Sequence, residues 1–314
     1  MTSVVNTPSA VRPPRSRLSK LFRAICHAPG ATLCAIVILL MFVYAFVTPL
    51  FYQNPFEFAG MSVLDSFIPP MWMEEGMSDF PLGTDDQGRN LLTAMAYGMR
   101  TSIFVGILSV VIGLVLGGGL GLIAGFVGGK VDAFIMRVAD VQLAYPALLL
   151  AMIIDGAARA ALGAERSVTT AITIVVLSIG IAFWVQYART IRSSVMIERD
   201  QDYVSAARIT GRSNLSIIAL HILPNVMAPV LVIATINLGI AIITEATLSF
   251  LGIGIPVTTP SLGTLIRNGN NFLQSGEWWI SVWPCLVLVL FVVSVNILGD
   301  HLRDVYNPRL RGRS

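Results

Sequence analysis

The sequence predicts an all-α, polytopic membrane protein, a bundle of six transmembrane helices with its N- and C-termini in the cytoplasm. Composition gives the first reason, because 55% of the 314 residues are apolar, only 12% are charged and the mean hydropathy is +0.75. Soluble domains typically have about 25% charged residues. The lengths of the apolar runs and the placement of Lys and Arg between them give the other two reasons.

Six apolar runs underlie the predicted number of helices. A helix needs about 20 predominantly apolar residues to cross the hydrocarbon core. The five clear runs are residues 31–50, 101–127, 168–188, 226–250 and 278–298. A sixth run, 138–154, contains Asp140, Gln142 and Pro146. Because polar groups and proline are tolerated where neighbouring helices cover them, we expect this run to be buried in the bundle.

Basic residues concentrate on one side of such a bundle. With the N-terminus inside, the inner segments hold 16 Lys and Arg and the outer segments hold five. Cytoplasmic loops carry this kind of excess positive charge. The net charge of +3 therefore reflects membrane topology. The sequence contains no basic stripe interleaved with aromatic residues outside the membrane flanks, so it does not indicate nucleic-acid binding.

The same features predict how the chain is divided. The expected parts are a disordered basic cytoplasmic N-terminus (1–28), a first transmembrane helix (29–50), an extracytoplasmic loop (51–100), a core transmembrane domain (101–300) and a basic cytoplasmic tail (301–314). Within the core domain, the polar segment 189–224 lies between two apolar runs and is expected to be a cytoplasmic loop.

Glycines recur at every fourth position through the second apolar run and just beyond it. They are Gly113, Gly117, Gly121, Gly125 and Gly129. This spacing extends the small-xxx-small pattern, which lets the backbones of two helices approach closely. The pattern predicts a tightly packed helix, either as plain structural packing or as part of a bundle that moves.

Catalytic and metal-binding patterns are absent from the sequence. There is no H-E-x-x-H or G-x-S-x-G motif, and the three cysteines have no metal-ligand spacing. The stretch AGFVGGKV resembles a phosphate-binding loop, but Ala124 and Val131 stand where that motif needs Gly and Ser or Thr. We therefore predict a non-catalytic chain that binds no metal or cofactor.

Glu245 is the one ionisable residue deep in a clear apolar run. A charge in the membrane is costly, so such residues face the bundle interior or a water-filled cavity. Asn237 lies two helical turns earlier on about the same face. Two interpretations are open: these residues line a translocation pathway, or Glu245 is a structural residue near the outer end of its span.

The polar segment predicts a short helix over residues 202–211, with an acidic residue, Asp202, in the first turn, where the helix dipole favours negative charge. Small residues gather on one face of this helix, namely Ala206, Ala207, Thr210 and Gly211. Arg208 lies on another face. The helix is either a docking surface for a partner protein or a solvated linker.

At these residues the sequence resembles the membrane subunits of binding-protein-dependent ABC importers. Their signature is E-A-A, three residues, Gly, nine residues and I-x-L-P. The matching positions are Ser205-Ala206-Ala207, Gly211 and His221-Ile222-Leu223-Pro224. Ser205 and His221 depart from the signature. Residues 82–102, 250–269 and 278–313 narrow the resemblance to the second, C-type permease of the dipeptide, oligopeptide and nickel class.

The resemblance implies a fold of the type I ABC importer kind in a bacterial inner membrane, and a transport machine with several subunits. The chain would pair with a homologous permease, two cytoplasmic ATPases that use ATP and Mg, and an external solute-binding protein. ATPase coupling would involve Asp202, Tyr203, Ser205, Ala206, Ala207, Arg208, Gly211, Leu223 and Pro224. The expected solutes are di- and oligopeptides, with nickel or opines as alternatives. A secondary transporter or channel that works without an ATPase is the distant alternative.

Overall fold

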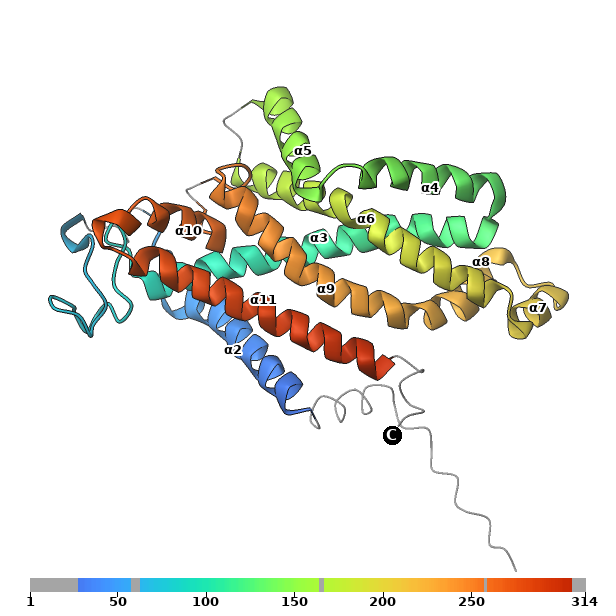
Figure 1. Ribbon diagram of the computed structural model, residues 1–314, viewed down its shortest axis with the longest axis horizontal. Coiled ribbons are helices and arrows are strands. Elements are labelled where there is room, and N and C mark those ends of the chain that lie inside the picture. Colours follow the sequence, from blue (N-terminus) through green and yellow to red (C-terminus); the bar gives the residue numbers. More distant parts are fainter. Residues whose placement is uncertain (1–27, 58–62, 164–166, 257–258, 307–314) are drawn as a thin grey trace, which may run out of the picture.

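The computed structural model describes residues 28–57, 63–163, 167–256 and 259–306, which form an elongated bundle of helices (Figure 1). The predicted disordered N-terminus, apart from its last residue, and the last residues of the basic tail lie outside the described residues. Apart from an isolated bridge between Thr84 and Asn90, no β-pairing occurs in the described part of the chain. The predicted all-α class is confirmed.

In chain order the helices are α2 (Pro29–Phe51), α3 (Leu91–Val127), α4 (Gly129–Leu143), α5 (Ala147–Leu162), α6 (Val168–Arg199), α7 (Asp202–Ile209), α8 (Asn214–Ile217), α9 (Leu223–Phe250), α10 (Leu262–Asn270) and α11 (Trp279–Tyr306). Short 3-10 turns span Val63–Asp65 and Leu273–Ser275, and a π-helical turn spans Ile218–Ile222. Within the described ranges, five helices are long and apolar enough to cross a membrane, or six if α4 and α5 form one broken span.

The run 138–154, expected as a single span, is divided in the structure. Helix α4 ends at Leu143, α5 begins at Ala147, and the two helices are bent by 91°. Pro146 explains the break, because it lacks an N–H and its ring disfavours helical geometry at the residue before it. The sixth apolar run therefore forms a bent pair of helices and not one straight helix.

Helices α3 and α6 lie side by side over most of their length, and glycines on α3 make this possible. A Cβ added to Gly117 would lie 2.1 Å from the backbone oxygen of Trp184, and one added to Gly121 would lie 2.5 Å from that of Ala188. Gly113 and Gly125 also face α6. Gly129 does not continue the stripe, because it is the first residue of α4 and a Cβ there would meet nothing within 4 Å.

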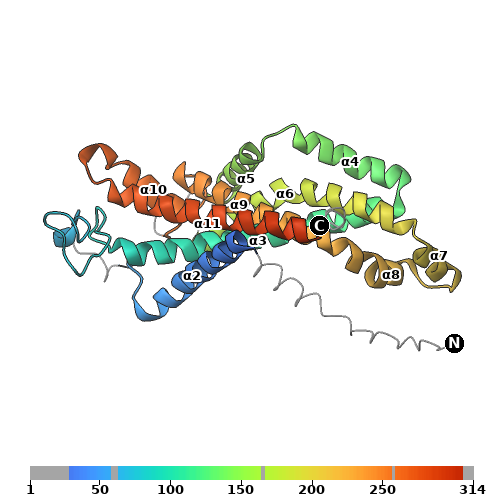
Figure 2. The same ribbon diagram turned by 60° about the horizontal axis from the view of Figure 1, so that its bottom comes forward.

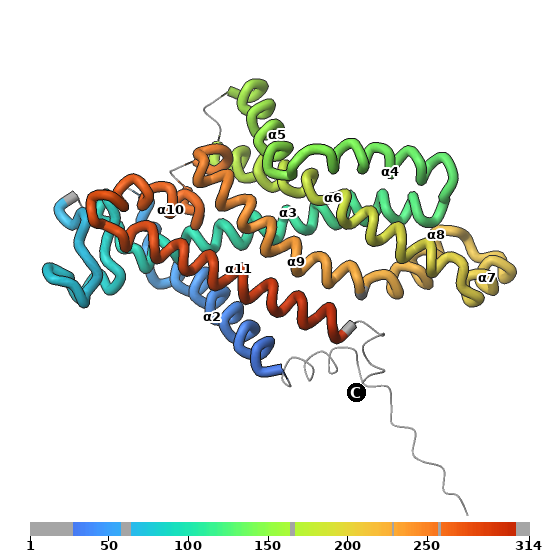
Figure 3. Tube along the Cα trace, viewed as in Figure 1, coloured from blue at the N-terminus to red at the C-terminus, as the bar shows by residue number. Residues whose placement is uncertain are grey.

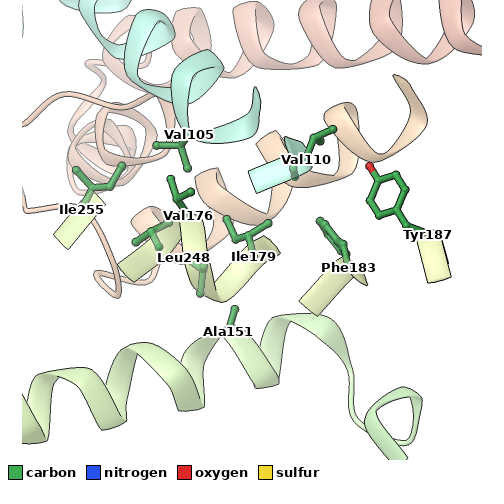
Figure 4. Packing of buried hydrophobic residues seen from close by; sticks show 11 residues of the cluster. Val105, Val110, Ala151, Val176, Ile179, Phe183, Tyr187, Leu248 and Ile255 are labelled. Atoms are coloured by element: carbon green, nitrogen blue, oxygen red, sulfur yellow. The ribbon is translucent and has the colours of Figure 1, made fainter. Parts of the chain in front are cut away.

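Apolar side chains from α3, α5, α6 and α9 meet in the main buried cluster. Figure 4 labels Val105, Val110, Ala151, Val176, Ile179, Phe183, Tyr187, Leu248 and Ile255 of this cluster. A second cluster joins α2 and α11 to α3 and α9. The bundle is thus held along its length by side chains from helices that are distant in the sequence.

The two ends of the bundle carry different structures (Figures 2 and 3). Helices α7 and α8 form one end, here called the α7 end. Helix α10 and the loop between α2 and α3 form the other, here called the α10 end. The described chain thus places the polar segment and the long loop at opposite ends of the molecule.

A buried ion pair shapes the loop at the α10 end. The Asp85 carboxylate accepts hydrogen bonds from the backbone N–H groups of Gln87 and Arg89 and from the Arg89 side chain at 2.6 Å. Burial raises the pKa of Asp85 above its ordinary value, although the positive charge of Arg89 and these hydrogen bonds act in the opposite direction. The neighbouring Asp86 accepts a hydrogen bond from Asn268 of α10 at 2.6 Å, which joins the loop to that helix.

Candidate functional site

Helix α7 is a separate short helix at the tip of the α7 end. Asp202 lies in its first turn and Arg208 in its last, where each charge suits the helix dipole. At its end, the Gly211 N–H donates to the Arg208 oxygen and the Arg212 N–H donates to the Ala207 oxygen. Gly211 has φ of 76°. This is a Schellman cap, in which glycine adopts the left-handed conformation without steric cost.

The inner side of α7 is seated on the rest of the chain. Val204 and Ala207 are buried in an apolar cluster with Ile217 and Ile222 from the following turns and Val195 from α6. The expected small-residue face is therefore split. Ala207 packs inside the chain, whereas Ala206, Thr210 and Gly211 are exposed.

The outer side of α7 and its loop exposes large apolar side chains. Ile209 is 87% exposed and Leu215 lies nearby in the sequence with a comparable exposure. Ser205, Ala206 and Arg208 share the exposed part of the surface. We call Ser205, Ala206, Arg208, Ile209 and Leu215 the α7 surface. The importer signature does not specify Ile209 or Leu215. The available sequence signal for this surface was the presence of these two apolar residues on either side of Gly211 within a polar segment.

Polar and aromatic contacts hold α7 against the start of α9. The ring of Tyr203 stacks on that of His221, with centroids 6.3 Å apart. The Tyr203 hydroxyl donates to the Glu198 carboxylate and accepts a hydrogen bond from Asn225 at 3.1 Å. Burial, followed by the hydrogen bond with Glu198, raises the pKa of Tyr203. His221, a departure from the family signature, thus supplies a flat surface on which Tyr203 rests.

Leu223 and Pro224 begin α9 directly after the π-helical turn. The Leu223 N–H donates to the Ile218 oxygen, five residues earlier. Pro224 has no N–H to donate, so the regular hydrogen-bond pattern cannot pass through it. A π turn contains one residue more than a regular α-helical turn. Such turns often occur at functional sites. Leu223 packs against the cluster under α7, and Pro224 is exposed.

The end of α6 is also fixed to α3. The Arg199 guanidinium donates to the backbone oxygens of Gly125 at 3.1 Å and Phe126 at 3.3 Å. These oxygens belong to the last turn of α3, where backbone carbonyls lack partners within the helix. The α7 surface is therefore carried on the joined ends of two long helices.

Asn237 and Glu245, the expected pathway residues, are enclosed within the chain. Glu245 is fully buried, and its two carboxylate oxygens accept hydrogen bonds at 2.7 Å from Ser102 of α3 and Ser249 of α9. Asn237 is also buried, and its side-chain nitrogen has no hydrogen-bond partner among the described residues. Neither side chain is open to a solute in this conformation.

No metal-binding group emerges from the described ranges, in which no three His, Cys, Asp or Glu side chains gather to hold an ion. The site described here is a protein surface. It consists of a short capped helix, seated by its own core, that presents two apolar side chains at one end of a membrane-spanning bundle.

Comparison with known proteins agrees with this class of molecule. The family described as "Binding-protein-dependent transport system inner membrane component" matches residues 117–312. The di/tripeptide transport system permease protein DppC of Pseudomonas aeruginosa is 36% identical over 97% of this chain and 95% of its own length. The dipeptide transport system permease protein DppC of Haemophilus influenzae is 34% identical over 95% of this chain and 97% of its own length.

A solved structure shows the same fold. A chain of the MetNI methionine ABC transporter, in an inward-facing conformation, superposes with a TM-score of 0.52 and 21% identity, covering 68% of this chain and 96% of that one. The present chain belongs to the family of binding-protein-dependent transport system inner membrane components. It is a multi-pass permease subunit of the ABC transporter kind.

Proposed function

We propose that this chain and a homologous partner permease form the pathway by which an ATP-driven importer carries short peptides across a bacterial inner membrane. An external solute-binding protein would deliver the peptide. Support for the peptide class comes from the relatives named as dipeptide and di/tripeptide permeases, which match almost the whole chain.

The α7 end is the proposed cytoplasmic end. The segments at this end, with the two termini, carry most of the Lys and Arg residues of the sequence, and cytoplasmic loops of membrane proteins have this bias. The loop between α2 and α3 and helix α10 would then face the external binding protein.

The α7 surface is the proposed docking site for a cytoplasmic ATPase. The observation that carries this proposal is that Val204 and Ala207 seat α7 on its own chain while Ile209 and Leu215 remain exposed. Exposed apolar side chains on a rigid helix are suited to a groove in a partner protein. ATP and Mg would be used by the ATPases, and the permease would take no part in the hydrolysis.

Coupling would follow from differential affinity. ATP favours the closed ATPase pair over the open pair, and a docked α7 conveys that preference to the bundle as a shift between two conformations. Asn237 and Glu245 would line the pathway only in a conformation in which the helices packed around α9 separate from it, since both are enclosed here.

Co-purification tests the docking proposal. We expect Ile209→Glu to remove most of the ATPase from the purified permease pair, because a buried carboxylate in an apolar groove is unfavourable. Leu64→Glu provides the control, since Leu64 is 97% exposed and lies at the α10 end. Both variants should reach wild-type levels in the membrane.

The amounts of ATPase retained by the two variant complexes decide whether α7 is the docking site. Loss of ATPase from the Ile209→Glu complex but not from the Leu64→Glu complex supports docking through α7. Full retention of ATPase by Ile209→Glu together with normal solute uptake would reject it. A wild-type chain that transports alone in liposomes would reject the importer as a whole.

A further inference from the structure

The break between α4 and α5 encloses a surface pocket. It has a volume of about 380 Å³ and is lined by Arg137, Val138, Val141, Gln142, Tyr145 and Leu150. Figures 1 and 2 both place the break near the middle of the long axis of the bundle. In many secondary transporters, broken helices at the middle of the membrane hold the solute.

One side of α4 is firmly fixed to α6. Asp132 forms an ion pair with Arg192, and Asp140 forms one with Arg189 at 2.5 Å. The Gln142 side chain donates to the backbone oxygen of Ile181 at 2.7 Å. Its oxygen accepts a hydrogen bond from the Trp184 indole at 2.5 Å. These contacts hold α4 in one rotational setting, so the side chains on its other side point away from the bundle.

Arg137 lies on that outward side. It is exposed, and it forms no ion pair or hydrogen bond with any residue in the described ranges. Its neighbours on the same side, Phe134, Val138 and Val141, are apolar and exposed. Both acidic residues of α4, by contrast, are paired with α6.

This arrangement is unfavourable if the outward side of α4 faces lipid. A guanidinium among apolar residues of a membrane-spanning pair is stable where it faces water or an ionic partner. At about 1.5 Å per residue, Arg137 lies roughly 12 Å along α4 from Gly129. Water or an ionic partner therefore has to reach Arg137 at that distance from the start of the helix.

Resting on the proposed function, we propose that the outward side of α4 and the α4–α5 break form part of the wall of the translocation pathway, and that Arg137 binds the carboxylate of the passing peptide. A short peptide carries a C-terminal carboxylate that is ionised at neutral pH. A guanidinium recognises a carboxylate through two parallel hydrogen bonds. The apolar residues and Tyr145 around it would accept side chains of varied size without specific contacts.

Cysteine labelling tests the wall and needs no solute. In a cysteine-free background, Val141→Cys places a thiol in the pocket and Val115→Cys places one on α3, outside it. The native side chains are 59% and 67% exposed, respectively. A charged, membrane-impermeant thiosulfonate reacts with thiolates, which form in water and not in lipid. We expect labelling of Val141→Cys to be at least tenfold faster in the complex reconstituted with its partner subunits.

Equal and slow labelling at both positions would show that the outward side of α4 faces lipid or a protein interface and would overturn the proposal. Equal and slow labelling would overturn only the assignment of the pathway wall. If the chain is not part of an ATP-driven importer, the purified complex would instead lack an associated ATPase, whatever the labelling rates.

Uptake tests the role of Arg137 with radiolabelled dialanine as the probe. We expect Arg137→Gln to lower uptake at least tenfold and Arg137→Lys to lower it less, while ATP hydrolysis stimulated by the binding protein remains. Lys130→Gln is the matched control, because Lys130 is the other basic residue of α4, likewise forms no ion pair with any described residue, and lies at the start of the helix, outside the pocket. Wild-type uptake by Arg137→Gln, or an equal loss in Lys130→Gln, would overturn the assignment of the carboxylate site.

Discussion

The Ser102 hydroxyl donates a 2.7 Å hydrogen bond to the Glu245 carboxylate across the interface between α3 and α9. The same hydroxyl accepts a hydrogen bond from the backbone N–H of Leu262, at the start of α10, at 3.2 Å. One buried serine of α3 thus joins its helix to α9 and α10, which are consecutive in the chain but far from α3 in the sequence. The only acidic residue deep in a clear apolar run is the centre of this junction.

Replacing Glu245 tests the junction. We expect Glu245→Leu to lower the thermal unfolding midpoint in detergent, because Ser102 and Ser249 lose an acceptor and an unsatisfied buried group costs about 1–3 kcal/mol. Glu245→Gln keeps the shape and one acceptor oxygen, so its effect should be smaller. Equal midpoints for wild type and Glu245→Leu would contradict a structural role for this contact.

The seam between α3 and α6 can be tested with two alanines on one helix. Gly117→Ala should destabilise the protein by about 1–3 kcal/mol, because its Cβ would lie 2.1 Å from the Trp184 oxygen and must force the helices apart. Gly119→Ala meets nothing within 4 Å and should stabilise α3 slightly, since alanine is the better helix former. The thermal midpoints and membrane levels of the two variants measure the difference; similar values would argue against backbone contact at Gly117.

Tryptophans at adjacent positions of α7 should separate folding from docking. Ala207 is buried, so Ala207→Trp should disturb the seat of α7 and lower the thermal midpoint of the isolated permease. Ala206 is exposed, so Ala206→Trp should leave that midpoint unchanged and weaken only the association with the ATPase. The prediction is wrong if both variants lower the midpoint to the same extent.

The cap of α7 predicts a graded series at Gly211. Its φ of 76° costs an alanine about 1–2 kcal/mol, whereas asparagine tolerates this conformation better. A Cβ at this position would meet nothing within 4 Å. We therefore expect limited proteolysis of the α7 loop to be fastest in Gly211→Ala, intermediate in Gly211→Asn and slowest in wild type. An Asn variant cleaved faster than the Ala variant would contradict this order.

Much of the fold could be predicted from the sequence, since hydrophobic length and positive charge identify membrane helices without tertiary information. The spacing of Gly117 and Gly121 also indicated a close helix contact. The partner helix could not be predicted, because a four-residue repeat defines a face but not what packs against it. Pro146 was visible as an interruption of the apolar run, but the size of the 91° bend could not be predicted from it, because the angle depends on how the two helices pack.

At the candidate site, the sequence located α7 but not its orientation. Ala206 and Ala207 have the same side chain, so only packing against Val204 and Ile217 decides which one is buried. The positions of Glu245 and Arg137 show the same limit. Glu245 stood out by charge within an apolar run, whereas Arg137 precedes the run 138–154 and did not; the enclosure of one and the exposure of the other follow from contacts between distant segments.

The glycine seam has a mechanical consequence. Helices α3 and α6 touch backbone to backbone from Gly113 to Gly125, and Arg199 ties their ends together. Two rods joined along their length resist bending much more than either rod alone. A displacement of α7 should therefore rotate the pair as a single beam, and a small shift at one membrane face would emerge at the opposite face as a larger sideways movement.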